Sequence, residues 1–467
     1  MRFSASLTRK LIYSLGILLL FGIMVPYTQW LEVRQKEQEL GEATIGQVDA
    51  GSFLLKLALL GGFRGMAVNI LWTRAIDLQK VHDWDRMKTT IDMITKLQPH
   101  FLAVWTYQSW NLAYNVSVEW DAPEDKYDWI KKGIQFVQEG VKKNRRSPDL
   151  VWDTAWYYHH KLGFSDEAVI IRRLYHDDKD DEFKSNEEGI VRNDNFQLAH
   201  DWFKRAVDLV DSGEAGARPA TSMESPIEYV DAPVQHKGRP GDLHFRTMPA
   251  HSYTRYAAAL EKESMKGIPA TFGARAREAW DNALSAWLDF GLFEFACHNN
   301  DKEKVRLDDY DNPDRFKTLS KNQQYWIGRW GDQTQYMYWK DRCKAEREPQ
   351  GVEARRLFYE GTKAIKAANF PEAAQKYQQG LDIWDKLLAR HPTYEGDFLN
   401  KRDTGLIVKR YVRALKNAGL DVPEKMPFKD LLKAVEKDNT VDPYDALEMM
   451  PASSESAPQS QSGAPGS

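Results

Sequence analysis

The stretch Val68–Pro99, VNILWTRAIDLQKVHDWDRMKTTIDMITKLQP, decides the fold of this chain. Apolar residues recur in it at steps of three and four, so it predicts two short helices that each have one apolar face. Asp83 suits the N-cap of the second helix, and Pro99 ends that helix. The two faces are Ile70, Leu71, Ala75 and Leu78, and then Trp84, Met87, Ile91 and Ile94. Because versions of this pair return along the chain, the sequence predicts an all-α array of helical repeats.

Later helix pairs place small residues beside bulky ones at a recurring spacing. In WDTAWYYHHKLGFSDEA, Trp152 takes a bulky position of a first helix, Gly163 the turn and Ala168 the crossing of the two helices. ARRLFYEGTKAIKAANFPEAAQKYQQGLDIW has the most regular spacing. Small residues let two helices approach, and an aromatic ring fills the space one turn away. The expected repeat positions are Trp152, Gly163, Ala168, Ala199, Phe203, Ala206, Leu357, Gly361, Ala373, Tyr377 and Gly380.

This spacing resembles the tetratricopeptide repeat, in degenerate copies over about half of the chain. Trp156 occupies a position where that repeat has a small residue, so the superhelix is expected to be irregular. The overall layout also resembles uncharacterised bacterial membrane-anchored proteins with tetratricopeptide-like regions. The resemblance implies an α-solenoid and gives no activity.

Length and charge limit the class of protein. A chain of 467 residues is too long for one core, so two or three units are expected. The net charge of −4 argues against a nucleic-acid-binding protein, which would normally carry a basic excess. The chain contains sixteen tryptophans, whose large side chains are expected to pack between helices. The alternative is that some of them line an aromatic binding groove. Cys297 and Cys343 form no CxxC motif, and their pairing in a disulfide stays open.

The N-terminus predicts a membrane anchor. Leu11–Trp30 is an uncharged run that would span about 30 Å as a helix, one hydrocarbon core. Arg2, Arg9 and Lys10 precede it, which favours a cytoplasmic N-terminus and an extracytoplasmic remainder at the inner membrane. A cleaved signal peptide is the alternative, but no Ala-x-Ala site follows the run. Residues 53–72 form a second apolar stretch that two charges interrupt, which indicates a buried or interfacial helix.

The expected organisation follows from shifts in composition along the chain. Residues 212–252 are rich in Gly, Pro and Ser, yet contain enough apolar residues that we expect this insertion to pack against the solenoid. The final stretch is low in complexity and is expected to be disordered. The predicted parts are a cytoplasmic 1–10, a membrane helix 11–30, a linker 31–52, a first tetratricopeptide-like region 53–211, an irregular insertion 212–252, a middle helical region 253–345, a second tetratricopeptide-like region 346–440, and a tail 441–467.

Two polar clusters are candidate metal sites. His159, His160, His176 and the aspartates at 177, 178, 180 and 181 combine imidazole with carboxylate, but they lack the i, i+4 spacing of two ligands on one helix. DDYDNPD, from Asp308 to Asp314, lacks the glycine and distal glutamate of an EF-hand loop. No GxSxG, HExxH, P-loop or GxGxxG motif is present. We therefore expect no catalytic residue, no metal and no cofactor.

The sequence favours an interaction scaffold that binds a protein or peptide, with no nucleic acid and no small-molecule substrate. Polar positions of the first helices are the expected contacts: Asn69, Thr73, Gln108, Asn111, Asp153 and His160. A glycan- or cell-wall-binding module that uses Trp105, Trp110 and Trp120 is one alternative. A metal-dependent enzyme at His159 and His176 is the other.

Overall fold

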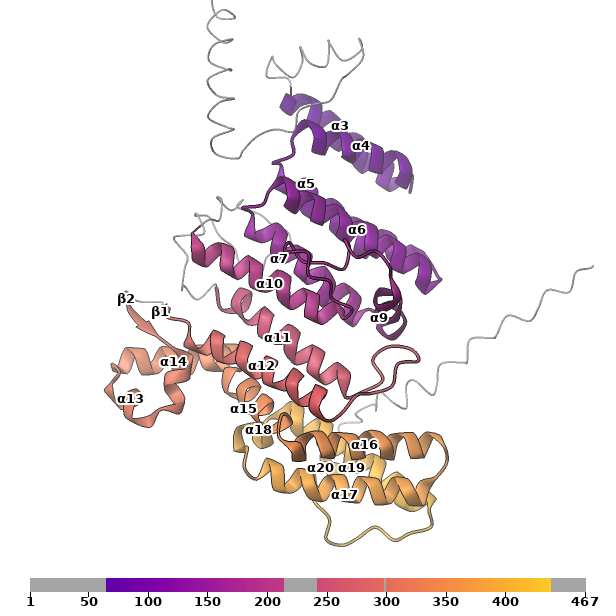
Figure 1. Ribbon diagram of the computed structural model, residues 1–467, viewed down its shortest axis with the longest axis vertical. Coiled ribbons are helices and arrows are strands. Elements are labelled where there is room, and N and C mark those ends of the chain that lie inside the picture. Colours follow the sequence, from indigo (N-terminus) through magenta and orange to yellow (C-terminus); the bar gives the residue numbers. More distant parts are fainter. Residues whose placement is uncertain (1–63, 214–241, 298–299, 438–467) are drawn as a thin grey trace, which may run out of the picture. The chain divides into compact units, whose positions relative to one another are not determined.

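The structure is a computed structural model that describes residues 64–213, 242–297 and 300–437 (Figure 1). The chain divides into two compact units, Met1–Trp105 and Thr106–Ser467. The boundary falls inside α5 (Leu102–Trp110), and therefore inside the region 53–211 that the sequence predicted as one part. The predicted anchor Leu11–Trp30 and the predicted tail 441–467 lie outside the described residues.

In the first unit, α3 (Arg64–Lys80) and α4 (Trp84–Leu97) pack against each other as an antiparallel pair. Asp83 is the N-cap of α4, and its carboxylate accepts a hydrogen bond from the backbone N–H of Arg86 at 3.2 Å. Met87, Ile91 and Ile94 are buried, as predicted.

The predicted face of α3 is partly wrong. Ile70 is 65% exposed, whereas Val68 and Ala75 are buried. Val68 and Ala75 are seven residues apart and share one face, and Ile70 lies about 200° round the helix from Val68. The many apolar residues of α3 allow more than one face to be chosen, and contact with α4 selects this one.

The second unit is also helical. Its first half contains, in chain order, η1 (Asn111–Val116), η2 (Ser117–Glu119), α6 (Pro123–Lys143), α7 (Pro148–Trp156), η3 (Tyr157–Lys161), α8 (Leu162–Phe164), α9 (Ala168–Asp177), α10 (Asn195–Ser212), α11 (Asp242–Leu260) and α12 (Ala274–Leu292). Its second half contains η5 (Leu307–Asp311), α13 (Pro313–Thr318), α14 (Lys321–Thr334), α15 (Tyr336–Glu346), α16 (Pro349–Lys366), α17 (Phe370–Leu388), α18 (Pro392–Gly396), α19 (Phe398–Asn417) and α20 (Lys429–Lys437).

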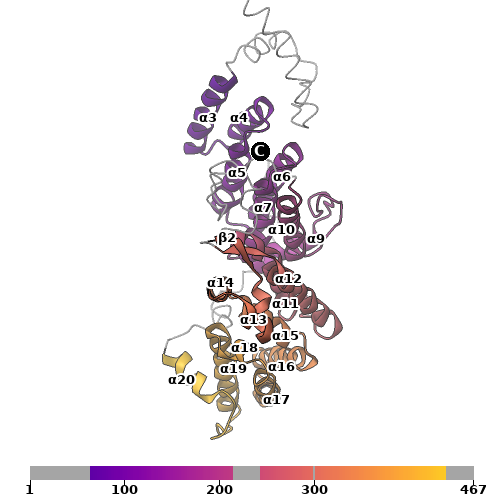
Figure 2. The ribbon, with the colours of Figure 1, turned by 90° about the vertical axis from the view of Figure 1, so that its left-hand side faces the viewer.

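Neighbours in sequence are neighbours in space. α7 packs on α10, α10 on α11, and α11 on α12, so these helices are stacked in order (Figure 1). The same holds for α16 with α17 and for α17 with α19, and α20 lies against α19 (Figure 2). Each helix buries its apolar stripe against the next one. This arrangement is compatible with a helical repeat solenoid, and it confirms the predicted all-α class.

One element departs from that class. β1 (Phe295–Cys297) and β2 (Asn300–Val305) pair as an antiparallel hairpin inside 253–345, the predicted middle helical region. Phe295 and Cys297 are buried, and Phe295 packs edge-on against Trp330 of α14. The run Phe-Glu-Phe-Ala-Cys is short and rich in aromatic residues, which favours a strand over a helix.

The small residues at repeat positions lie where helices cross. Ala373 is fully buried between α16 and α17, as predicted. A Cβ atom on Gly361 would lie 3.0 Å from the ring of Tyr377, and a Cβ atom on Gly380 would lie 2.6 Å from the ring of Phe358. These glycines therefore permit close approach of the two helices. The other predicted repeat positions that are buried are Trp152, Ala199, Phe203, Ala206, Leu357 and Tyr377.

Gly163 has a different role from the expected one. It lies within α8 and does not form the turn, and a Cβ atom there would meet the ring of Phe196 at 2.5 Å. The glycine is thus needed for contact with α10. Ala168, expected at a crossing, is the first residue of α9 and is only half-buried.

The predicted insertion 212–252 is helical at its C-terminal end. α11 begins at Asp242, and Phe245 and Met248 are buried in it, with the ring of Phe245 stacked against Trp152. Residues 214–241 lie outside the described part. α11 includes Pro249, so the part of the predicted insertion from residue 242 onward is helix.

Cys297 and Cys343 are both buried free thiols. None of the helices in the described ranges is both long and apolar enough to cross a membrane.

Candidate functional site

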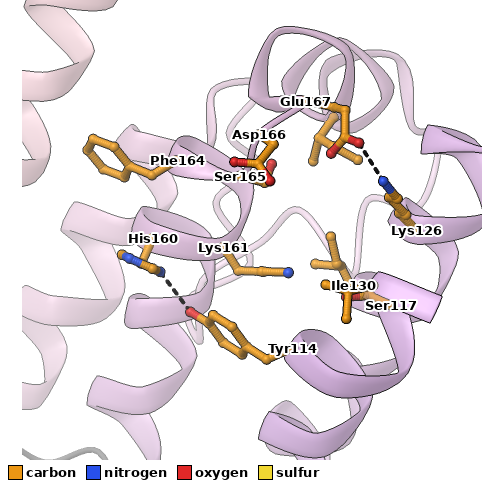
Figure 3. A pocket seen from close by; sticks show the side chains of 12 residues that line it. Tyr114, Ser117, Lys126, Ile130, His160, Lys161, Phe164, Ser165, Asp166 and Glu167 are labelled. Atoms are coloured by element: carbon orange, nitrogen blue, oxygen red, sulfur yellow. Dashed lines mark hydrogen bonds and ion pairs between the residues drawn. The ribbon is translucent and has the colours of Figure 1, made fainter. Parts of the chain in front are cut away.

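The site is a cavity of about 380 Å³ in the second unit. Its walls come from η1, η2, α6, η3, α8 and the turn that leads into α9 (Figure 3). The volume lies within the range of ligand pockets in proteins. Tyr114, Ser117, Val118, Lys126, Ile130, His160, Lys161, Phe164, Ser165, Asp166, Glu167 and Ile171 line it.

Two π-helical segments lie against each other in the wall of this cavity. η1 continues α5, and η3 continues α7, and both have the wider i→i+5 turn. Such turns are rare, and they are frequent at functional sites because they re-aim the side chains that follow. Here they place Tyr114 and His160 opposite each other, with Tyr114 Oη 2.9 Å from His160 Nδ1. The two segments therefore form the wall of the cavity that holds most of its aromatic and basic groups.

Lys161 is the central polar group of the cavity. Only 9% of its surface is exposed, and its ammonium group points into the space between Tyr114 and the turn at Asp166 (Figure 3). Among the described residues no carboxylate or other acceptor forms an ion pair or hydrogen bond with Lys161 Nζ. Lys161 Nζ lies over the ring of Tyr114, 4.8 Å from its centroid. Desolvation by burial lowers the pKa of Lys161 and outweighs the nearby charges of Glu167 and Asp166, which raise it.

The surrounding groups leave that charge unmatched. The carboxylate of Glu167 is paired with Lys126 on the opposite wall. Desolvation by burial, followed by the charge of Lys161, lowers the pKa of His160, so the imidazole is neutral near pH 7. The hydroxyl of Ser165 is buried and has no hydrogen-bond partner among the described residues. The cavity thus offers the ammonium group of Lys161 and the hydroxyl of Ser165 to an incoming acceptor, and the carboxylate of Asp166 lies in the same lining.

The rim of the cavity is apolar. Val118 is 62% exposed and Phe164 is 45% exposed. Phe164 forms tilted ring contacts with His160 and His159 and lies beneath the guanidinium of Arg255, 5.1 Å from its Cζ. A group bound to Lys161 would therefore be flanked by apolar surface.

Three of the six predicted partner-binding residues are buried. Gln108, Asn111 and Asp153 are at most 2% exposed, so these positions are covered although they were expected to be open. Asn69 and Thr73 are exposed on α3, and the Thr73 hydroxyl donates to the carbonyl of Asn69. His160 is half-buried in the cavity wall and is the one residue of the six that lines it.

The histidine and aspartate cluster is divided among structural contacts. His159 is buried, with Nδ1 3.0 Å from the Ser252 hydroxyl, whereas His176 is half-buried beside Asp177. Asp178 and Asp180 both pair with Lys131, at 2.8 and 3.0 Å. No group of three histidine, cysteine or acidic side chains in the described ranges is placed to hold a metal ion.

The acidic loop at 308–314 is likewise occupied by cations. Asp308 and Asp311 both contact Lys340 Nζ, at 2.7 and 2.8 Å, and Asp309 pairs with Arg315. The carboxylates therefore neutralise a buried lysine.

The tryptophans named for glycan binding differ in exposure. Trp105 is 3% exposed and Trp110 is half-buried, and only Trp120 reaches 40%. The ring of Trp120 stacks on Trp129, which is itself covered by the ammonium of Lys132 at 4.0 Å.

The sequence reasoning missed Lys161, Ser165 and Tyr114. Lys161 is the one formally charged side chain in the run from Thr154 to Phe164, and a single lysine among buried positions could have indicated it. No protein-family model matches the chain, and a comparison with curated proteins found no similar sequence.

Proposed function

We propose that this chain is a binding protein: a helical scaffold that holds a protein or peptide partner by an acidic side chain inserted into the cavity at Lys161. The single observation that carries the proposal is the buried ammonium group of Lys161, which points into a cavity and has no acceptor among the described residues. An unpaired buried charge destabilises a fold. A carboxylate from a partner would remove that cost and accept a second hydrogen bond from Ser165.

The rim fits a side chain carried on a polypeptide. Val118 and Phe164 offer apolar contacts around the opening, as expected where a partner's backbone passes over a pocket. In the same proposal, α16 and α17 form a tetratricopeptide-like hairpin, and Leu11–Trp30 anchors the chain in the inner membrane with the solenoid outside the cytoplasm. The uncharged run Leu11–Trp30 and the basic residues before it support the anchor.

The test is a photo-crosslinker placed at the rim of the cavity. A benzophenone side chain at Val118 in the full-length protein should capture a partner in intact cells. Lys161→Met should abolish that capture, because it keeps the length of the side chain and removes the charge. Lys179→Met is the matched control, since Lys179 is exposed and lies outside the cavity. A second crosslinker at Tyr325, equally exposed, reports capture that has nothing to do with the cavity.

Stability gives an independent readout. Lys161→Met should raise the unfolding temperature, because it removes an uncompensated buried charge, while it lowers partner capture. Capture at Val118 that is unchanged by Lys161→Met would refute the proposal, as would a fall in the unfolding temperature.

A further inference from the structure

Basic side chains form a stripe along α19 in the second unit. This helix carries six lysine or arginine residues and one aspartate, although the whole chain has a net charge of −4. Four of the cations follow one another at steps of seven, four and three residues, which places them on one side of the helix. We call these four residues the basic stripe: Arg402, Lys409, Arg413 and Lys416. Lys409 is half-buried, and the other three are exposed.

The opposite side of α19 fixes the helix in the fold. Thr404 and Tyr411 are buried on that side. The hydroxyl of Thr404 accepts a hydrogen bond from Trp384 Nε1 of α17 at 3.2 Å, and the hydroxyl of Tyr411 donates to Gln378 of the same helix. Because α17 holds α19 from this side, the basic stripe faces away from α17.

α20 packs against α19 within the basic stripe (Figure 2). Gly405 lies three residues after Arg402 and four before Lys409, so it is on the same side of α19 as these two cations. A Cβ atom on Gly405 would lie 2.5 Å from the side chain of Val435 in α20. Since α20 ends at Lys437, the residues that follow it start beside the basic stripe.

The residues that follow α20 have the complementary charge. Residues 438–467 contain five carboxylates and no lysine, arginine or histidine. Four of the five fall within residues 438–448, which we call the acidic segment. Its carboxylates belong to Asp438, Asp442, Asp445 and Glu448.

The acidic segment is long enough to reach every cation of the basic stripe. At the helical rise of about 1.5 Å per residue, Lys416 lies about 16 Å along α19 from Gly405, and Arg402 lies about 5 Å from it. The five residues that lead from α20 to Asp442 can span about 17 Å, and three more to Asp445 add about 10 Å. A short tether also keeps these carboxylates at an effective concentration on the order of millimolar, so weak individual ion pairs are enough for occupancy.

We propose that the acidic segment of this chain docks on the basic stripe of α19. Its carboxylates pair with the lysine and arginine side chains on either side of the crossing with α20. An anionic partner of another kind then has to displace the chain's own segment from this surface. Neither α19 nor α20 lines the Lys161 cavity, so the docking is independent of the proposed partner site.

Zero-length carbodiimide cross-linking of the full-length protein tests the docking, because the reagent joins a lysine to a carboxylate only where the two are in contact. Mass spectrometry should find Lys409 or Lys416 linked to carboxylates of the acidic segment. The exposed ion pair between Lys142 and Glu182, whose Nζ and Oε1 lie 2.6 Å apart, is the internal reference for the yield.

Arg413→Gln should lower the yield of these links several-fold relative to the reference pair. It removes one charge of the basic stripe but no lysine that can be cross-linked. Arg329→Gln is the matched control, since Arg329 is an exposed arginine of α14, and it should leave the links unchanged. Raising the salt concentration to about 0.5 M should also weaken the links, because exposed ion pairs are screened.

The reactivity of the lysines gives a second measurement. Replacement of three carboxylates of the acidic segment by amides, Asp442→Asn, Asp445→Asn and Glu448→Gln together, should make the two lysines of the basic stripe react several-fold faster with an acetylating reagent. Lys179, which is exposed elsewhere in the second unit, should react at the same rate in both proteins.

Several results would overturn the proposal. These are the absence of links between the acidic segment and the basic stripe, links that Arg413→Gln leaves unchanged, and unchanged acetylation in the triple variant. Links from Asp445 and Glu448 to Lys433 of α20 as strong as those to the basic stripe would also overturn it, because they would reflect the tether alone. Links that join isotopically heavy and light copies would make a second molecule the occupant. Lys161→Met should leave the links intact, so this docking and the partner site can fail separately.

Discussion

Two glycine-to-alanine substitutions should have opposite effects on stability. Gly380→Ala lies in α17 at its contact with α16, and Gly328→Ala lies in α14. The added Cβ atom at 380 would lie 2.6 Å from Cε1 and 2.8 Å from Cδ1 of Phe358, whereas nothing lies within 4 Å of one at 328. Neither glycine has a positive φ angle, so backbone strain plays no part.

The expected magnitudes follow from two terms. Both substitutions gain about 1 kcal/mol from helix propensity, since alanine is the better helix former by that amount. At 380 the new methyl group is about 1 Å too close to a ring whose carbons prefer separations of about 3.5–4 Å. Phe358 is 5% exposed and packs edge-on against Trp384, so its ring cannot move away freely. Overpacking of this kind costs about 1–3 kcal/mol.

Gly328→Ala should therefore stabilise the protein by about 0.5–1 kcal/mol. Gly380→Ala should destabilise it by about 1 kcal/mol, once propensity is subtracted from the clash. Thermal unfolding followed by far-UV circular dichroism should show shifts of about 2–4 °C per kcal/mol in opposite directions. If Gly380→Ala raises the unfolding temperature as much as Gly328→Ala does, then α16 and α17 do not approach as closely as the structure has them.

Two further predictions concern the same end of the chain. Ala373→Leu should lower the free energy of unfolding by about 1–3 kcal/mol, because Ala373 is fully buried where α16 and α17 meet. An unchanged unfolding temperature would argue against that crossing. His391 should stabilise the fold at low pH. Its two ring nitrogens lie 2.8 Å from Asp341 and 2.9 Å from Glu348. The hydrogen bond to Asp341 is the main cause that raises the pKa of His391, and the hydrogen bond to Glu348 raises it further. This contribution to stability is complete below the pKa of about 6.5 that His391 has in the unfolded chain, and it is lost as the pH rises through the higher pKa of the folded state. The denaturation midpoint should therefore fall between pH 6 and pH 8. His391→Gln should make the midpoint less dependent on pH over that range.

The sequence predicted the buried face best for helices that have a single apolar stripe. The face of α6, with Ile130, Ile134, Val137 and Val141, is buried as its spacing required. The same periodicity gave the wrong face for α3, where Ile70 is exposed, because a helix that is apolar on several sides leaves the choice to its neighbours. Periodicity thus predicts that a helix exists more reliably than it predicts which side is covered.

The cavity could not be predicted by the same reasoning. It depends on two π-helical segments, η1 and η3, and these break the 3.6-residue period on which the positions of polar side chains were judged. Asp153 precedes η3 and is buried by α10, while Lys161 at its end points into the cavity. The burial of Lys161 also depends on α6 and α9, which are distant in sequence. Local spacing carries no information about such contacts.

Lys161 differs from the other buried cations of the second unit that the structure describes. Arg172 pairs with Asp194, and Lys340 pairs with Asp308. Among the described residues no carboxylate forms an ion pair with Lys161, and a buried charge that lacks its partner costs several kcal/mol. Lys161 therefore suits an occupant that brings its own carboxylate and excludes water. Because a buried ion pair is screened little by salt, capture at the cavity should change little when the salt concentration is raised to about 0.5 M.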